Sequence, residues 1–438
     1  MFSLSKTHKT NHQLRIISFA IAGFTAVLLM GGFLIRGADA QQHLPIDIVY
    51  TETNIPTENG NSILGFQRDA SGTLTSLPTS PFPTGGAGIA NATIVVNPVI
   101  NTTFLSDQEV LVNPEHTRLF AVNSGSSTIA VFDINQDGSL SPVKGSPFPS
   151  GGVEPVSLGL AGNFLYVVNQ NLDPQKPSQE ASDSLPNYTA FRVTPRGRLV
   201  SVNNSTISVP EGSIPAQALI SPNKHLLFGA DTGSGLLRSY QILWNGRLLN
   251  SPNSPQSLPA SASPAGGPLP VPLGLQVHPQ QPILYVGFTN INKLGVYSYD
   301  KDTGELTFLK AVPSSGIAIC WIATNRGGTR LYTSNPGDNS ISVYDIAQDP
   351  TTPVEIQKVT LKGPGGDAQL TLDSTESFLQ VVSQPISTTT TEGNGLHVLA
   401  VTPQDGTLSE VSSSPLPLPS VDNSFIQGIV ALHNRGRN

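Results

Sequence analysis

The sequence contains a single cysteine, Cys320, in 438 residues, so no disulfide can form within the chain. A zinc site built from cysteine ligands is excluded for the same reason, because such sites need several thiolates. Neither a His-Glu-x-x-His nor a Gly-x-Ser-x-Gly segment occurs, so the motifs of zinc proteases and of α/β-hydrolases are missing. We therefore expect neither a metal nor another cofactor.

Charged residues are also scarce, at 12% of the sequence, and the formal net charge is −7. Because no cluster of lysine and arginine is present, nucleic acid is not an expected partner. Glycine (41) and proline (37) are abundant instead. This balance is typical of chains with many turns and short strands, and not of chains with long helices.

The N-terminal segment has the pattern of an export signal. Basic residues precede an uncharged apolar run at 16–35, and Ala-Asp-Ala at 38–40 is a small-x-small cleavage pattern. The run could also stay as an uncleaved anchor, because twenty apolar residues are enough to span a bilayer. We expect residues 1–40 to be a signal peptide or anchor, 41–438 to be one domain, and the protein to be secreted or periplasmic.

A Gly-x-Leu motif recurs along the chain, each time soon after a run of alternating apolar and polar residues. Its glycines are Gly72, Gly138, Gly197, Gly246, Gly304 and Gly406. Neighbouring glycines are 49 to 66 residues apart except for the last two, which are 102 apart, so one unit has lost its glycine. Alternating runs joined by glycine turns are typical of antiparallel hairpins, and a fixed period of this size predicts a repeat architecture.

A second recurring position lies in the centre of the second strand of each expected unit, and it is aromatic in all units but the last. These anchors are Tyr50, Phe120, Tyr166, Phe228, Tyr285, Tyr332 and Gln380. They define seven units of four strands. The unit without the glycine turns through Asp349–Pro353 instead, and Asn91–Asp107 and Asn171–Pro186 are insertions between units or strands.

The two ends of the chain predict how the repeats close. The first unit begins at Asp47 with a second strand, while the apolar run Phe425–Leu432 has no partner nearby in the sequence. We infer that this run supplies the missing first strand, which removes an exposed sheet edge. An open β-solenoid is the alternative, but its repeats are shorter than these units of about 55 residues. The predicted fold is all-β, a seven-bladed β-propeller of four-stranded blades closed by the C-terminal strand.

One unit resembles a known family. It reads Leu-Phe-Ala-Val-Asn-Ser-Gly-Ser-Ser-Thr-Ile-Ala-Val-Phe at 119–132 and Asp-Gly-Ser-Leu at 137–140. It resembles the seven-bladed propeller lactonases, a group that includes bacterial 6-phosphogluconolactonase. The resemblance implies hydrolysis of a lactone, a carboxylic ester, by histidines and an arginine where first strands begin. The matching segments 213–219, 271–274 and 319–323 hold neither residue type, so the family's catalytic residues are not carried over.

The candidate site is a ring of residues where the first strands begin, since these strands line the channel of a propeller. The ring is Gly428, Glu109, Ser157, Gln217, Gly274, Trp321 and Gln369. Glu109 is the candidate general base if burial raises its pKa. Trp321 could stack on a ring, Ser157, Gln217 and Gln369 could bind the ligand, and the glycines would leave room for it. The alternative is that these residues only fill a channel lined by water.

A second ring, at the ends of the second strands, contains Asp231. Asparagine and aspartate there are expected to cap turns, with ligand contact as the alternative for Asp231. His116, His225 and His278 lie in the turns after the first strands, away from the expected funnel. We expect them at the surface.

Two functions remain open from the sequence. One is an exported enzyme that binds and hydrolyses a small lactone or sugar-derived ligand in its funnel. The other is a non-catalytic propeller that binds a protein or a polysaccharide outside the cytoplasm. Contact with a membrane is expected only through an uncleaved N-terminal anchor.

Overall fold

The computed structural model describes residues 46–90, 106–171, 185–385 and 392–434, and the backbone of two short strands at 95–96 and 100–101. The chain divides into two compact units, Met1–Gln42 and His43–Asn438, and every described residue lies in the second. The predicted N-terminal signal therefore lies outside the described residues. Among the described residues, no helix is long and apolar enough to cross a bilayer.

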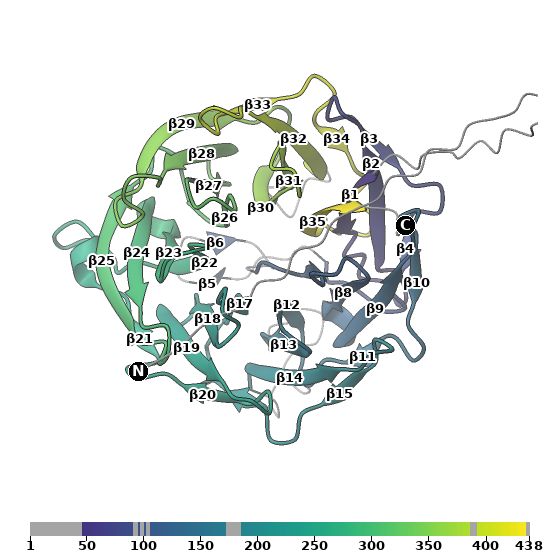
Figure 1. Ribbon diagram of the computed structural model, residues 1–438, viewed down its shortest axis with the longest axis horizontal. Coiled ribbons are helices and arrows are strands. Elements are labelled where there is room, and N and C mark those ends of the chain that lie inside the picture. Colours follow the sequence, from purple (N-terminus) through teal and green to yellow (C-terminus); the bar gives the residue numbers. More distant parts are fainter. Residues whose placement is uncertain are drawn as a thin grey trace, which may run out of the picture. The chain divides into compact units, whose positions relative to one another are not determined.

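Seven antiparallel sheets surround a central axis in the second unit (Figure 1). We number them as blades 1 to 7 along the chain. Blade 1 contains β35 (Gln427–Asn434), β1 (Ile46–Glu52), β2 (Ser62–Arg68), β3 (Leu74–Ser76) and β4 (Phe82–Pro83). Blade 2 contains β7 (Val110–Val112), β8 (Arg118–Asn123), β9 (Thr128–Ile134), β10 (Leu140–Pro142) and β11 (Phe148–Pro149). Blade 3 contains β12 (Pro155–Ala161), β13 (Phe164–Asn169), β14 (Asn187–Val193), β15 (Leu199–Ser201) and β16 (Ile207–Ser208).

The remaining blades follow the same order from the axis outward. Blade 4 contains β17 (Leu219–Ile220), β18 (Leu226–Asp231), β19 (Leu236–Ile242), β20 (Leu248–Asn250) and β21 (Gln256–Ser257). Blade 5 contains β22 (Pro272–Val277), β23 (Ile283–Phe288), β24 (Lys293–Tyr299) and β25 (Leu306–Pro313), and blade 6 contains β26 (Ile322–Thr324), β27 (Arg330–Asn335), β28 (Ser340–Asp345) and β29 (Val354–Thr360). Blade 7 contains β30 (Gly366–Leu372), β31 (Phe378–Gln384), β32 (Gly395–Val401), β33 (Leu408–Glu410) and β34 (Leu416–Pro417). Five short elements belong to no blade. They are the hairpin strands β5 (Val95–Val96) and β6 (Ile100–Asn101) and the 3₁₀ turns η2 (Ser124–Ser126), η3 (Ala260–Ala262) and η4 (Thr289–Ile291).

The C-terminal strand closes the ring, as predicted. β35 pairs with β1 in antiparallel register, with Tyr50 opposite Val430 and Ile46 opposite Asn434. The innermost strands also contact their neighbours around the whole circle, from β35 through β7, β12, β17, β22, β26 and β30 back to β35. The strand runs from Gln427 to Asn434, two residues later at each end than the apolar run that predicted it. The fold is thus a closed seven-bladed propeller.

The two sequence repeats meet at the joints between blades. The tyrosine anchor of one blade donates its hydroxyl hydrogen to a glycine carbonyl in the turn of the next: Tyr50 to Gly138 (2.6 Å), Tyr166 to Gly246 (3.0 Å) and Tyr332 to Gly406 (3.1 Å). Where the glycine is missing, Tyr285 donates to the carbonyl of Pro350 at 2.8 Å. Each such bond stabilises the joint by about 1 kcal/mol. The repeated tyrosines and turn glycines of the sequence are therefore residues that hold neighbouring blades together.

Gly138 shows why these turns need glycine. Its φ is +81°, a left-handed conformation, and a Cβ atom there would lie 2.2 Å from Cδ1 of Ile48 in blade 1. A side chain would therefore be strained and would also clash with the neighbouring blade. The anchors themselves, Gln380 included, are at most 1% exposed, so each joint is packed as core.

Candidate functional site

A cavity of about 370 Å³ lies between the first strands of several blades. Its apolar wall includes Val110, Leu219, Leu275, Ile322, Leu370 and Ile429. Asp107, Gln108 and Gln217 line the end near the strand starts, while His116, Arg326, Ser374 and Glu376 line the end near the turns between first and second strands. We call this space the axial cavity. It reaches the face with these turns, whereas the sequence predicted a funnel at the face of the strand starts.

The polar end of the axial cavity is built partly by an insertion. Ser106 and Asp107 are the described end of the stretch Asn91–Asp107, and together with Gln108 they run between blades 2, 3 and 4. The amide of Asp107 donates to the carbonyl of Ala216 (3.4 Å), and the amide of Leu158 donates to the carbonyl of Gln108 (3.0 Å). These backbone bonds hold the Asp107 side chain against the cavity.

Burial gives Asp107 an unusual acidity. Removal from water raises the pKa of this carboxyl to about 7, although a hydrogen bond from the amide of Gln108 (2.9 Å) partly opposes the shift. The Nε2 atom of Gln217 lies 3.4 Å from its Oδ2 atom. No ion pair of Asp107 with a cation is found in the described part of the chain. Near neutral pH this group can therefore both accept and return a proton.

Glu109, the predicted general base, is fully buried beside the cavity and does not line it. Its Oε1 atom accepts hydrogen bonds from Nε2 of Gln369 (2.8 Å) and from Oγ of Ser106 (2.8 Å). Burial raises the pKa of Glu109 well above its ordinary value, and the nearby charge of Asp107 raises it further. A protonated, enclosed carboxyl is a poor base for water in the cavity. Catalysis by Glu109 stays a prediction. Asp107 is better suited to act as a general base, because it lines the cavity and its pKa is about 7.

The other polar members of the ring have different positions. Gln217 lines the cavity and clamps blade 4 to blade 5, since its carboxamide bonds both the amide (2.8 Å) and the carbonyl (3.2 Å) of Leu275. Gln369 is buried and bonded to Glu109. Ser157 is buried and accepts a hydrogen bond from the amide of Ala218 at 3.1 Å. Ligand contact by these three residues stays a prediction, and only Gln217 borders the axial cavity.

Trp321 and the ring glycines are packed against neighbouring strands, and stacking of Trp321 on a ligand stays a prediction. The Trp321 side chain is 4% exposed and belongs to the largest hydrophobic core, while its amide donates to Oγ of Ser334 at 3.0 Å. A Cβ atom on Gly274 would lie 2.1 Å from the carbonyl oxygen of Cys320 in the next blade. The space that the glycines were predicted to leave for a ligand is therefore occupied by neighbouring strands.

Asp231 is engaged within its own blade. Its carboxylate pairs with Arg238 (2.5 Å) and accepts hydrogen bonds from the amides of Ile214 (2.9 Å) and Ser234 (3.1 Å). This is the turn-capping role expected for the second ring. Ligand contact by Asp231, which is fully buried, stays a prediction with no support from these bonds.

The three turn histidines differ from one another. His225 is exposed, as expected. The same expectation is wrong for His278, which is 2% exposed and hydrogen-bonded through Nε2 to the carbonyl of Gly328 (3.1 Å). His116 is half-buried and lines the axial cavity. In the part of the chain that the structure describes, no group of three or more His, Cys, Asp or Glu side chains is placed to hold a metal ion.

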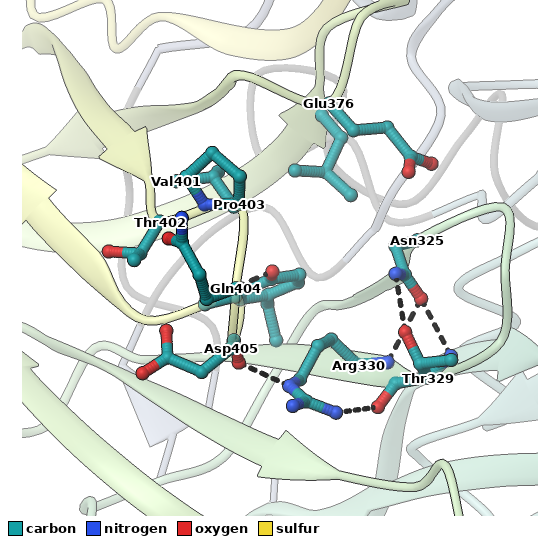
Figure 2. Close-up of a pocket in the computed structure, with 12 residues that line it drawn as sticks. Asn325, Thr329, Arg330, Glu376, Val401, Thr402, Pro403, Gln404 and Asp405 are labelled. Atoms are coloured by element: carbon teal, nitrogen blue, oxygen red, sulfur yellow. Dashed lines mark hydrogen bonds between the residues drawn. The ribbon is translucent and has the colours of Figure 1, made fainter.

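A smaller cavity of about 120 Å³ lies between blades 6 and 7, and we call it the crevice (Figure 2). Its wall on blade 6 includes Asn325 and Arg330, and its wall on blade 7 includes Thr402, Gln404 and Asp405. Figure 2 shows the Arg330 guanidinium turned toward the backbone of Asp405, to which its Nε atom donates. Two residues, Leu372 and Glu376, line both the crevice and the axial cavity.

Comparison with known proteins agrees with this architecture. Residues 263–412 match the family model described as "Lactonase, 7-bladed beta-propeller". This match confirms the resemblance to the propeller lactonases. A search of curated protein sequences gives no match.

Solved structures share the fold at low sequence identity. A protein from Bacteroides uniformis, named as a candidate 6-phosphogluconolactonase, has a TM-score of 0.64 and 14% identity over 88% of this chain and 99% of its own. The periplasmic gluconolactonase of Pseudomonas aeruginosa has a TM-score of 0.62 and 15% identity over 88% and 99%. A hypothetical selenium-binding protein from Sulfolobus tokodaii reaches 0.59 and 12% over 91% and 97%. Because differently named proteins share this fold, the function of this chain must be argued from its own site.

Proposed function

We infer that this protein binds a small sugar-derived lactone in the axial cavity and hydrolyses it. The observation that carries this proposal is the placement of Asp107, an acid with a pKa near neutrality, at the polar end of an apolar-walled cavity of about 370 Å³. Cavities of this size hold small metabolites and have a few polar groups in mostly apolar walls. The match to the lactonase model and the gluconolactonase neighbour support the choice of substrate class.

The chemistry needs one group that takes a proton and gives it back. Ionised Asp107 removes a proton from water, and the water oxygen forms a bond to the lactone carbonyl carbon. The ring C–O bond then breaks, and protonated Asp107 returns the proton to the leaving ring oxygen, which becomes the hydroxyl of a hydroxy acid. Gln108 and Gln217 lie at the same end of the cavity, where carboxamides can hold the hydroxyls of the sugar.

Export of the protein is part of the same proposal. It is supported by the basic residues, the apolar run at 16–35 and the small-x-small pattern at 38–40. An exported lactonase would act on lactones outside the cytoplasm, which suits an unphosphorylated substrate.

The test is turnover of a panel of sugar lactones by the purified protein and by single variants. Asp107→Asn should lower kcat by about 100-fold or more, the range for a lost general base, while Glu109→Gln should retain most activity. Asp302→Asn, in an exposed turn, is the matched control. If Glu109→Gln is inactive and Asp107→Asn keeps its activity, the general base is Glu109 and not Asp107. Saturable binding of a protein or polysaccharide with no turnover of any lactone would favour the non-catalytic alternative.

A further inference from the structure

The crevice adjoins the axial cavity at a fixed point. Glu376 lines both spaces and lies in the turn between β30 and β31, with a left-handed φ of +57°. Its Oε1 atom accepts a hydrogen bond from the amide of Arg326, which also lines the axial cavity. Since this bond joins the turns of blades 6 and 7, the boundary between the two cavities is held in place.

The guanidinium of Arg330, the one cation among the described lining residues of the crevice, is committed to partners in the fold. The Arg330 guanidinium donates to Oδ1 of Asp345 (3.0 Å) and to the carbonyl of Thr329 (2.6 Å), in addition to the carbonyl of Asp405. Asn325 is bonded to Thr329 (2.8 Å). Gln404 is exposed at the edge of the crevice, in the position two residues before the turn glycine. The crevice therefore has no uncommitted cation among its described lining residues, and its carboxylates (Glu376 and Asp405) and carboxamide (Gln404) are groups that can bond sugar hydroxyls.

The axial cavity does not favour a phosphorylated ligand. Among its described lining residues Arg326 is the one lysine or arginine, and three acidic residues, Asp107, Asp373 and Glu376, share the lining with it. Phosphate recognition relies on several cationic or N–H donors arranged around the anion. A neutral ligand rich in hydroxyl groups fits this balance of charge better.

We propose that the axial cavity and the crevice form two subsites of one binding site, and that the ligand is a neutral aldonolactone carrying a second sugar. The lactone ring occupies the axial cavity, and the attached sugar passes Glu376 and lies in the crevice between blades 6 and 7. The two-subsite proposal rests on the proposed function, and it specifies in addition that the substrate is a disaccharide and carries no charge. Gln404 is the specificity residue for the second sugar.

The experiment compares two substrates that share one lactone ring. Glucono-δ-lactone is the single-sugar substrate, and cellobiono-δ-lactone carries an additional glucosyl group on the same ring. We expect kcat/KM to be about tenfold higher for the disaccharide, which corresponds to about 1.4 kcal/mol. Gln404→Ala should reduce this preference to less than about threefold without changing kcat/KM for glucono-δ-lactone. Gln136→Ala, at the equivalent turn position before Gly138 in blade 2, is the matched control and should change neither value.

The outcomes separate this inference from the function on which it rests. Equal kcat/KM values for the two lactones would overturn the second subsite and leave the lactonase function standing. The same holds if Gln404→Ala lowers kcat/KM equally for both lactones. A δ-lactone with an alkyl chain that reacts as well as the disaccharide would also overturn it, because the crevice would then not select a sugar. Absence of both turnover and calorimetric binding for either sugar lactone would refute the function and the subsites together.

Discussion

Replacement of Glu52 by glutamine should make the protein more stable at alkaline pH. Glu52 ends β1 next to the closing strand and is fully buried. Its carboxyl accepts a hydrogen bond from Nδ2 of Asn61, and none of the ion pairs in the described part of the chain includes it. Burial raises its pKa from 4.5 to about 8, although hydrogen bonds from Asn61 and Gln427 act in the opposite direction.

The sign of the effect follows from proton binding. Because the folded protein holds the proton more tightly than the unfolded chain does, the contribution of Glu52 is fully present below pH 4.5 and is lost as the pH rises through about 8. One pKa unit corresponds to about 1.4 kcal/mol. The difference between the two pKa values thus sets an upper limit of about 5 kcal/mol on the stability that wild type loses over this range. Glutamine cannot ionise, so the variant should avoid that loss.

The assay is thermal and urea unfolding of wild type and Glu52→Gln at pH 5 and at pH 8. The two proteins should be similar at pH 5, and the variant should be more stable at pH 8 by about 2–5 kcal/mol. Asp300→Asn is the control, because hydrogen bonds from the Thr303 amide and hydroxyl lower the pKa of Asp300 in an exposed turn. Its contribution is lost as the pH falls, so this variant should gain nothing at pH 8. Parallel pH profiles for wild type and Glu52→Gln would refute the reasoning.

Three further predictions concern the fold. Ile429→Asp places a charge in the closing strand at a side chain that is 8% exposed, and it should cost several kcal/mol or prevent folding; an unchanged melting temperature would contradict closure by this strand. Tyr285→Phe should cost about 1 kcal/mol in urea unfolding because it removes the hydroxyl that bonds the next blade. Tyr297→Phe should cost little, because the Tyr297 hydroxyl has no hydrogen-bond partner among the described residues. Equal losses in the two variants would argue against the joint. Gly274→Ala should destabilise the protein because a Cβ atom would lie 2.1 Å from a carbonyl oxygen of the next blade, and calorimetry that detects no loss would show that the blades can move apart.

The fold could be predicted from the sequence because its signals are repeated. One hairpin glycine or one aromatic residue is weak evidence, but both recur in step, and the structure shows that they touch at the blade joints. The unpaired run near the C-terminus was equally informative, since a strand without a neighbour needs a partner. The exact ends of that strand were not predictable from apolarity, because pairing with β1 continues through His433 and Asn434.

The site was predicted less well because it depends on residues outside the repeat. Aligning the units found Glu109, Gln217 and Gln369, which do lie near the axis, but alignment cannot tell a buried side chain from one that lines a cavity. Asp107 was missed because it belongs to an insertion with no counterpart in the other units. The signal that could have found it was a second carboxyl two residues before the predicted base Glu109, although the left-handed φ of +68° at Gln108 turns the chain so that Asp107 lines the cavity and Glu109 does not.

The same contrast explains where this propeller can change function without losing its fold. Glycine and tyrosine at the joints are fixed by backbone geometry and by hydrogen bonds between blades, so they tolerate little change. Asp107 and Gln404 instead lie in an insertion and at a turn edge, and no joint depends on the Gln404 side chain in the described structure. Substitutions there can alter the acid, the size of the site or its charge while the seven blades stay closed. A ligand preference in this protein should therefore follow these two segments and not the repeat that identifies the fold.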